Sequence, residues 1–301
     1  MFSDQLIELI LARRAPVCVG IDPMIEQFPD ALAGDKAARA KKSPRQVVDC
    51  YYDFVLEVLK IVAPLVPIVK FQSAYFEQYH ADGVEAYFDL INEAKQLGLL
   101  VIGDAKRGDI GSTSEAYAKG HLLPIDSEDA ATPDALTINP MLGMDAIEPF
   151  LQACEKTEKG AFVLVRTSNP GSKDFQDVDL KDGRTWSEHV AETLQPRITT
   201  PSLMGQHGYS NIGAVVGATQ THTMQSLRKR LPQSIFLLPG YGTQGATADM
   251  TRAAFDSRGL GAIVSASRSV LYPRVEAGES WQQAVARATT AMIEDVRKIA
   301  G

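Results

Sequence analysis

Cysteine and long hydrophobic runs are both scarce in this chain. The three cysteines, Cys18, Cys50 and Cys154, stand far apart and form no C-x-x-C pattern. Cys18 and Cys50 lie among apolar residues, which is typical of reduced cysteines that pack in a core. No apolar run reaches the roughly 18 residues that a membrane-spanning helix requires. The sequence therefore predicts neither a disulfide framework nor a membrane span.

Excess positive charge is missing as well. The 30 Lys and Arg residues are outnumbered by 37 Asp and Glu residues, which gives a formal net charge of −7. Because the chain has no excess of basic residues, nucleic acid is not an expected partner. An anionic small ligand would need a locally positive pocket. The first residues, with Asp4 early and Arg13-Arg14 after the apolar part, predict an amphipathic helix and not a signal peptide. We therefore expect a cytoplasmic protein.

The sequence shows no internal repeat and no low-complexity linker, so we expect residues 1–301 to form a single domain. What it does contain is a regular alternation of short apolar runs with helical patterns. The expected strands are Val17–Ile21, Val66–Phe71, Leu99–Gly103, Ala135–Asn139, Ala161–Arg166, Ile212–Val216, Ile235–Leu238 and Gly261–Ser265. Short, mostly apolar strands are typical of a parallel sheet that is covered on both faces. Eight βα units in 301 residues favour a closed (β/α)8 TIM barrel, an α/β fold, over an open doubly wound sheet.

The segments between these strands carry helical periodicity. Apolar residues recur at i, i+3, i+4 and i+7 over residues 47–62, which predicts one amphipathic helix. Similar patterns over residues 88–95, 147–154 and 281–292 predict three more, and Gly98 is a suitable stop for the first of these. The five histidines show no ligand or base spacing, and residues 196–209 indicate only a helix end and a loop.

Two connections are longer than the others. Pro23–Pro44 follows the first expected strand and Gly171–Arg184 follows the fifth, and both are rich in polar residues. Because both follow strands, we expect these inserted loops at the C-terminal face of the barrel, where active sites of this architecture lie. Either loop is compatible with a lid over a site or with a solvated surface loop.

The most informative run is Gly103–Thr113, which follows the third expected strand. Asp104 and Lys106 are two residues apart, so on a strand end both side chains point to the same side. Asp109 follows three residues later and adds a second acid near the mouth of the strand. Such clustering sets the pKa of a proton donor, but a strand-end salt bridge that only fixes a loop has the same pattern.

Two further charges belong to the same end of the barrel. Asp22 follows the first expected strand and Lys70 ends the second. With Asp104 and Lys106 they form an alternating set of carboxylates and ammonium groups that needs no metal. A divalent-cation site built from Asp22, Asp104 and Asp109 is the alternative, since hard cations take oxygen ligands. The two lysines argue against that alternative because they already balance the carboxylates.

The seventh and eighth expected strands lead into residues suited to an anion. Gly240, Gly242 and Gly245 form a literal G-x-G-x-x-G, but no acidic partner follows on a later strand, so a dinucleotide site is not favoured. In a barrel this loop is better interpreted as a phosphate cradle, in which Gln244 donates a hydrogen bond. Arg268, just after the eighth strand, can bind phosphate oxygens through its guanidinium. A salt bridge at the barrel rim is the alternative role for Arg268.

The fifth expected strand ends in Thr167-Ser168-Asn169-Pro170-Gly171, which places hydroxyl and amide groups at the mouth of the barrel. Small polar groups of this kind can bind the edge of a heterocycle. The same residues also favour a tight turn, and the two roles are compatible.

Taken together, these residues resemble the orotidine 5′-phosphate decarboxylase family. The run Asp104–Ile110 looks like the Asp-x-Lys-x-x-Asp-Ile signature of that family. Its amino-acid sequence is similar to that of the longer bacterial branch of the family. The resemblance extends in the same order to other strand ends: Asp22, Lys70, Ser168, the Pro-Gly-x-Gly-x-Gln run from Pro239 to Gln244, and Arg268. It implies a (β/α)8 barrel that converts orotidine 5′-phosphate to UMP and CO2 in pyrimidine nucleotide synthesis, without a metal or a cofactor.

The resemblance also implies a role for each matching residue. Lys106 is expected to protonate the ring carbon as CO2 leaves, with Asp104 facing the substrate carboxylate. Lys70 and Asp22 are expected to contact the ribose hydroxyls and to continue the charge network. Asp109 and Thr113 are expected to reach the site of a neighbouring subunit, which implies a homodimer. The expected ligands of the base and the phosphate are Ser168, Pro239, Gly240, Gln244 and Arg268.

Other functions share parts of this pattern. A metal-dependent sugar-phosphate decarboxylase or aldolase on the same barrel would use the same phosphate loops. A non-catalytic nucleotide-phosphate-binding protein would bind UMP and turn nothing over. The intact set of Asp104, Lys106 and Asp109 argues against the second possibility, because a sensor has no need of a buried proton donor.

Overall fold

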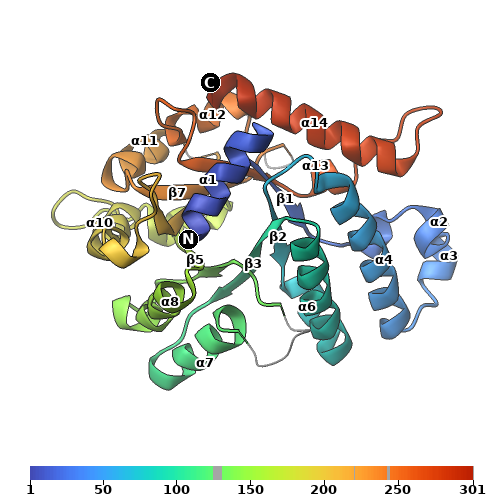
Figure 1. Cartoon of the computed structure of the whole chain (residues 1–301), viewed down its shortest axis with the longest axis horizontal. Helices are drawn as coiled ribbons and strands as arrows, with labels where there is room; N and C mark the ends of the chain where they lie inside the picture. The colour runs from blue at the N-terminus through green and yellow to red at the C-terminus, as the bar shows by residue number, and fades with distance from the viewer. Residues whose placement is uncertain (125–130, 220, 243–244, 301) are drawn as a thin grey trace.

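The eight predicted strands close into one parallel barrel in the order in which they follow one another along the chain (Figure 1). The computed structural model describes residues 1–124, 131–219, 221–242 and 245–300. The strands are β1 Val17–Ile21, β2 Ile68–Gln72, β3 Leu100–Arg107, β4 Ala135–Ile138, β5 Gly160–Arg166, β6 Ser210–Val216, β7 Ser234–Pro239 and β8 Ala262–Ala266. This arrangement confirms the predicted (β/α)8 barrel.

The strand boundaries differ from the prediction in two informative places. β2 begins at Ile68 and not at Val66, since Pro67 has no amide hydrogen to donate to a neighbouring strand. β3 extends beyond Gly103 to Arg107, so Asp104 and Lys106 lie within the strand, whereas Asp109 follows it. Its pairing with β4 shifts register between Gly103 and Arg107, which marks a bulge there.

Helices surround the barrel and begin at recognisable caps. The longer helices are α1 Phe2–Arg13, α4 Pro44–Val62, α6 His80–Gln96, α7 Gly111–Leu122, α8 Met144–Thr157, α10 Trp186–Ile198, α11 Thr221–Arg230 and α14 Trp281–Ala300. At the start of α4, Ser43 and Gln46 exchange hydrogen bonds in a capping box, and Pro44 occupies the first turn. Helices were predicted from periodicity within α4, α6, α8 and α14, and the structure confirms all four.

Short helical turns occupy many of the connections. They are α2 Asp30–Ala33, α3 Lys36–Arg39, α5 Ala74–Glu77, α9 Lys173–Gln176, α12 Ala248–Thr251, α13 Arg268–Leu271, and the 3-10 turns η1 Ile25–Gln27, η2 Pro170–Ser172, η3 Pro201–Leu203 and η4 Arg252–Ala254. The helix end and loop expected over residues 196–209 are present, with η3 between α10 and β6.

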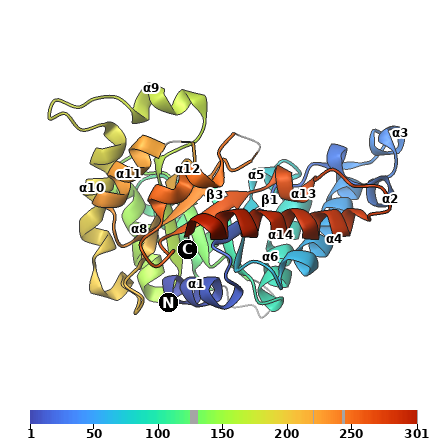
Figure 2. The same cartoon turned by 90° about the horizontal axis from the view of Figure 1, so that it is seen from above.

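The N-terminal helix closes one end of the barrel. Its apolar residues Phe2, Leu6, Ile7 and Ile10 are buried against side chains that fill the barrel interior. Phe2 meets Phe162 of β5 edge to face, with 6.0 Å between the ring centroids. Figure 2 shows α1 on one side of the barrel and α9, α12 and α13 on the other, so the carboxyl ends of the strands stay open for a site.

The inserted segment Pro23–Pro44 folds against the outside of the barrel. Phe28 stacks on Phe54 of α4 with 4.2 Å between the ring centroids. Arg39 donates to the backbone carbonyls of Glu26 and Phe28. α2 and α3 therefore lie beside α4, at the end of the molecule far from α9 (Figure 2). This packing favours an ordered arm over a lid.

The second insertion, Gly171–Arg184, is tied to the end of β5. The buried guanidinium of Arg166 makes two 2.8 Å hydrogen bonds to the carboxylate of Asp177. The amide of Thr167 donates to Gln176 over 2.7 Å. The base of this insertion is therefore held beside the strand end that carries Ser168.

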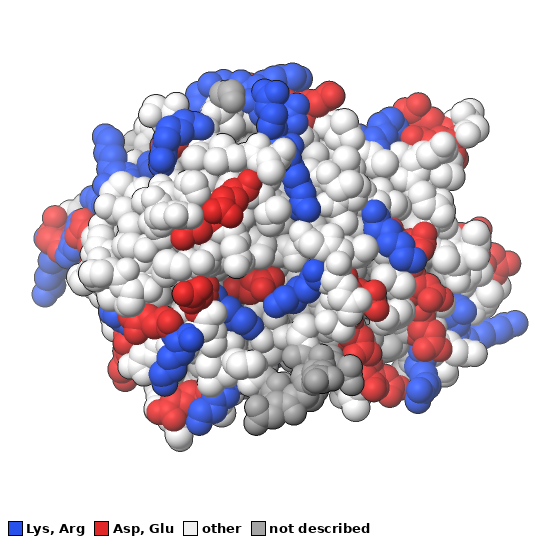
Figure 3. All heavy atoms as spheres, in the orientation of Figure 1, with Lys and Arg blue, Asp and Glu red and all other residues white. Residues whose placement is uncertain are grey.

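Cysteine burial, helix hydropathy and surface charge relate to the expectations from composition. Cys18 and Cys50 are buried free thiols, as predicted for packing residues, and Cys154 is also buried and free. Among the described helices, none is long and apolar enough to span a membrane. On the face drawn in Figure 3, basic and acidic side chains are interspersed and form no broad basic patch.

Candidate active site

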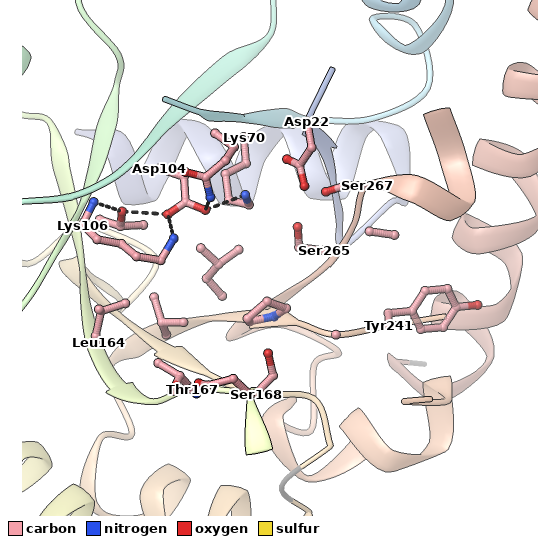
Figure 4. A pocket seen from close by; sticks show the side chains of 18 of the residues that line it. Asp22, Lys70, Asp104, Lys106, Leu164, Thr167, Ser168, Tyr241, Ser265 and Ser267 are labelled. Carbon is pink, nitrogen blue, oxygen red and sulfur yellow. Dashed lines mark hydrogen bonds and ion pairs between the residues drawn. The ribbon is translucent and has the colours of Figure 1, made fainter. Parts of the chain in front are cut away.

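A cavity of about 380 Å³ opens at the carboxyl ends of the strands (Figure 4). Side chains from most of the strands meet there. The lining residues are Asp22, Lys70, Gln72, Asp104, Lys106, Thr137, Leu164, Thr167, Ser168, Asn169, Val215, Leu237, Pro239, Gly240, Tyr241, Ser265, Ala266, Ser267 and Arg268. The cavity therefore brings together eight of the eleven residues that the sequence nominated.

Asp104 is the centre of the polar wall. Its two carboxylate oxygens accept hydrogen bonds from the ammonium groups of Lys70 and Lys106, each over 2.6 Å. The amide of Gln72 and the hydroxyl of Thr137 add donors at 3.0 and 2.9 Å. Figure 4 shows the two lysines approaching Asp104 from two sides. A carboxylate with four donors is fixed in orientation, which suits a preorganised site.

Charge pairing outweighs the effect of burial on the pKa values of both Asp104 and Lys70. Burial alone would raise the pKa of Asp104, but the ammonium groups of Lys70 and Lys106 outweigh it and hold that pKa well below its usual range. Burial would likewise lower the pKa of Lys70, but the carboxylates of Asp104 and Asp22 raise it above its usual range. Asp104 is therefore an anion and Lys70 a cation at neutral pH.

The two lysines differ in their access to the cavity. The side chain of Lys70 is 8% exposed, whereas that of Lys106 is 45% exposed. Lys70 therefore lies beneath Asp104 as part of the wall, and Lys106 presents its ammonium to a ligand. Asp104 and Lys106 were expected only to point to the same side of the strand end. Their side chains are in contact, but Lys106 has a φ of 48°, so simple strand alternation does not describe how they meet.

Asp22 offers an open acceptor to the cavity. Its carboxylate oxygen Oδ1 is buried and has no hydrogen-bond partner among the described residues. The backbone beside it is fixed, since the hydroxyl of Tyr272 donates to the Asp22 carbonyl and accepts from the amide of Met24. A buried acceptor without a donor is costly, so this atom is suited to a ligand hydroxyl.

The opposite wall carries the predicted polar groups after β5. Ser168 and Thr167 lie across the cavity from Asp104 and Lys106 (Figure 4). The backbone of Ser168 packs closely against Gly217, which follows β6. Glycine is required there because a Cβ at position 217 would lie only 2.8 Å from the Cα of Ser168. Ser168 is thus fixed by backbone packing as well as by the anchored insertion.

The third side of the cavity is formed by the ends of β7 and β8. Pro239, Gly240 and Arg268 line it as predicted, and Gly240 has a φ of 109°, a conformation that favours glycine. Arg268 is exposed, and no described residue forms an ion pair with it. The alternative of a rim salt bridge for Arg268 is therefore not favoured. Gln244 lies outside the described residues.

Two of the predicted site residues are not in the cavity of this chain. Asp109 and Thr113 are absent from its lining, and the Asp109 carboxylate accepts the amide of Ile110 over 2.8 Å. The expectation that Asp109 crowds Lys106 at the strand mouth is thus not met within one chain. Lys106 lies within the bulge of β3, whereas Asp109 follows the end of that strand at Arg107.

The sequence analysis did not single out Gln72 and Thr137. Gln72 follows Lys70 by two residues on β2, and strand alternation alone would have pointed it to the same face. Thr137 is the one polar residue in the apolar strand Ala135–Ile138, which is a usable signal for an inward-facing group. Neither signal identifies Asp104 as the partner, because that contact depends on strand register.

The alternative of a divalent-cation site receives no support from the geometry. Within the described ranges, no group of three or more His, Cys, Asp or Glu side chains is placed to hold a metal ion. Asp22, Asp104 and Asp109, which that alternative required together, are divided between the cavity and its exterior.

Comparisons with known proteins show which family the chain belongs to. The family model described as "Orotidine 5'-phosphate decarboxylase / HUMPS family" matches residues 15–282. The chain is 42% identical over 304 aligned residues to orotidine 5′-phosphate decarboxylase of Rhodopirellula baltica, covering 98% of this chain and 99% of the relative. It is 38% identical to the enzyme of that name from Caldicellulosiruptor bescii, covering 90% and 89%.

A solved structure shows the same architecture. The OMP decarboxylase of Leishmania donovani superimposes with a TM-score of 0.73 at 28% identity, covering 99% of this chain and 98% of that one. Family match, full-length relatives and fold all agree, and the chain belongs to the orotidine 5′-phosphate decarboxylase family.

Proposed function

We propose that this protein decarboxylates orotidine 5′-phosphate to UMP and CO2, with Lys106 as the proton donor. The observation that carries the proposal is the pairing of a buried Asp104 with a cavity-facing Lys106 in a member of this family. The fixed ammonium group lies where a ligand can reach it, and its partner carboxylate is immobilised by three further donors.

The chemistry needs one proton and one stabilised carbanion. When the bond between the pyrimidine ring and its carboxylate breaks, CO2 leaves and the electron pair stays on the ring carbon. An ammonium group held close to that carbon stabilises the developing negative charge, and transfer of its proton gives UMP. Asp104 accepts a hydrogen bond from the ammonium group of Lys106 and so holds this group in position at the cavity.

Asp104 and Lys70 set the electrostatics around the substrate carboxylate. Lys70 neutralises one oxygen of Asp104 from beneath, while the cavity side of the same carboxylate faces the reacting group. The four charges of Asp22, Lys70, Asp104 and Lys106 sum to zero before substrate binds. The substrate carboxylate adds one negative charge next to Asp104. When neutral CO2 leaves, this charge passes to the ring carbon beside Lys106, where the proton from Lys106 cancels it. Lys106 is then neutral and takes a proton from solvent before the next turnover.

The rest of the nucleotide is assigned to the remaining walls. The unpartnered oxygen of Asp22 and the neighbouring Lys70 are suited to the ribose hydroxyls. Ser168 faces the pyrimidine edge. Arg268, together with the backbone at Pro239 and Gly240 and with Gln244, holds the phosphate. Binding energy from the phosphate, which does not react, can be used to order the site around the ring.

We further propose that the enzyme is a single-domain, cytoplasmic homodimer in which Asp109 and Thr113 reach the partner's site. Both residues lie outside their own cavity. The surface near them exposes large apolar side chains: Ile110 is 59%, Met141 60% and Leu142 55% exposed. Exposed apolar groups of this size beside polar residues are typical of an interface.

The decisive experiment follows orotidine 5′-phosphate by ultraviolet absorbance with EDTA present and no cofactor added. We expect rapid loss of substrate and formation of UMP. Folded protein that binds UMP but turns nothing over would replace the proposal with a non-catalytic nucleotide-binding protein. Activity that appears only when magnesium is supplied would replace it with a metal-dependent relative on the same barrel.

A further inference from the structure

We propose that Thr137 is a positioning residue that holds the proton donor Lys106 and its partner Asp104 in their reactive arrangement. The proposal rests on the decarboxylase function given above. The proposal gives β4 a part in the reaction through Thr137. This residue carries no charge and acts by holding other residues, not by transferring a proton to the substrate.

The first observation is the register of β3 against β4. Gly103 pairs with Leu136 and Arg107 pairs with Ile138, so the three residues from Asp104 to Lys106 face Thr137 alone. Such an excess of residues on one strand leaves backbone groups of the bulge without ladder partners. The bulge contains both reactive side chains, so whatever stabilises it also places them.

The second observation is how Thr137 satisfies this bulge. Its side-chain oxygen Oγ1 accepts the backbone amide of Lys106 over 2.9 Å. The same hydroxyl lies 2.9 Å from Oδ1 of Asp104, and because a carboxylate can only accept, the hydroxyl donates there. Thr137 is 1% exposed, so water does not compete for either bond.

The third observation is the conformation that these bonds hold. Lys106 has a φ of 48°, in the left-handed region that a residue with a long side chain rarely adopts. Its ammonium group returns to the same carboxylate oxygen, Oδ1 of Asp104, to which Thr137 donates. One hydroxyl thus fixes both the backbone of the donor residue and the acceptor that aims its side chain. Strained backbone of this kind persists only where its surroundings determine it.

The substitution Thr137→Val tests the proposal, because valine keeps the shape of threonine and removes the hydroxyl. We expect kcat to fall by about tenfold to a hundredfold, while KM for orotidine 5′-phosphate and the Kd for UMP change by less than about threefold. Thr137→Ser, which restores the hydroxyl, should bring kcat back to within about threefold of wild type. A purely structural role predicts instead that KM, UMP binding and thermal stability deteriorate together with kcat.

The matched control is Thr289→Val. Thr289 is also fully buried, and its hydroxyl donates to the Val285 carbonyl within α14, away from the cavity. We expect this variant to lose some stability and to keep the wild-type kcat. An equal loss of kcat in both variants would overturn the proposal, since any buried hydroxyl would then have the same effect.

Hydrogen exchange separates failure of this inference from failure of the proposed function. Thr137→Val should lose protection at the Lys106 amide, whether or not the wild-type protein turns over orotidine 5′-phosphate. An inactive wild type would overturn the decarboxylase function. An active wild type with unchanged kcat and Lys106 protection in Thr137→Val would overturn the positioning role alone.

Discussion

Lys70 donates to one oxygen of the Asp104 carboxylate over 2.6 Å, and both side chains are only 8% exposed. Two oppositely charged groups at this depth stabilise each other, and removal of one leaves the other buried and uncompensated. The more exposed Lys106 shares the same carboxylate. The buried pair of Lys70 and Asp104 therefore stabilises the fold, whereas the pair of Lys106 and Asp104 faces the ligand. Substitutions at the two lysines distinguish these two roles.

Lys106→Ala is expected to abolish the chemical step and to leave the fold intact. The side chain is 45% exposed, and the buried pair of Lys70 and Asp104 remains. We expect kcat to fall by at least about a thousandfold, near the upper range for loss of a general acid. Circular dichroism and UMP binding should resemble wild type, and Lys156→Ala, at an exposed lysine on α8, is the control. Ordinary turnover by Lys106→Ala would refute the assignment.

Asp104→Asn is expected to destabilise the protein as well as to inactivate it. The variant leaves Lys70 buried without its carboxylate, which costs about 3 kcal/mol or more in the free energy of unfolding. Glu57→Gln breaks an exposed ion pair with Lys60 and should lower the free energy of unfolding far less, because solvent screens this pair. Urea denaturation at about pH 7 measures both differences.

The stability difference between wild type and Asp104→Asn should depend on pH with a defined sign. Because the pKa of Asp104 is lowered in the folded state, its contribution is complete above the unfolded-state pKa of about 4. It is lost as the pH falls from there toward the lower folded-state pKa. The difference in the free energy of unfolding between wild type and Asp104→Asn should therefore become smaller below about pH 4 and stay constant from about pH 6 to about pH 8. A gap that widens in acid would contradict the charge assignment.

The sequence was sufficient for the barrel and for part of the site. Apolar runs located all eight strands, and the two-residue spacing of Asp104 and Lys106 predicted that both point to one side of the strand end, where the structure shows them in contact. The bulge that shapes this contact was not predictable, because it depends on which residue of β4 faces it. The anchor between Arg166 and Asp177 was missed for a similar reason, since the two residues meet only after the insertion folds back on β5.

Arg268→Ala is expected to weaken substrate capture more than the chemical step. Arg268 lines the cavity without an ion-pair partner among the described residues, so its removal costs little stability. Loss of a charge-assisted contact with phosphate should lower kcat/KM by about tenfold to a hundredfold, mainly through KM. Arg252→Ala, at an exposed arginine paired with Asp249, should leave kcat/KM unchanged. An unchanged kcat/KM in Arg268→Ala would remove its phosphate role.

Asp177→Ala is expected to loosen the wall that carries Ser168. The substitution removes both hydrogen bonds from the buried Arg166, which then keeps its contacts with Thr167 and Ser172. We expect KM to rise by about threefold to tenfold with a smaller change in kcat, because the base-binding residue loses its position and not its hydroxyl. Asp174→Ala, on the same insertion, is the control. Equal effects of the two variants would indicate a general loss of the insertion and not of this anchor.

A mixture of two inactive variants tests whether the neighbouring subunit completes the site. Lys106→Ala removes the proton donor from its own cavity, whereas Asp109→Ala, under the homodimer proposal, affects only the partner's cavity. In a mixed dimer one site carries both defects and the other carries none. Random exchange of equal amounts makes half of the dimers mixed, so about one quarter of wild-type activity should return. If Asp109 acted within its own chain, every site of the mixture would stay defective and no activity would return.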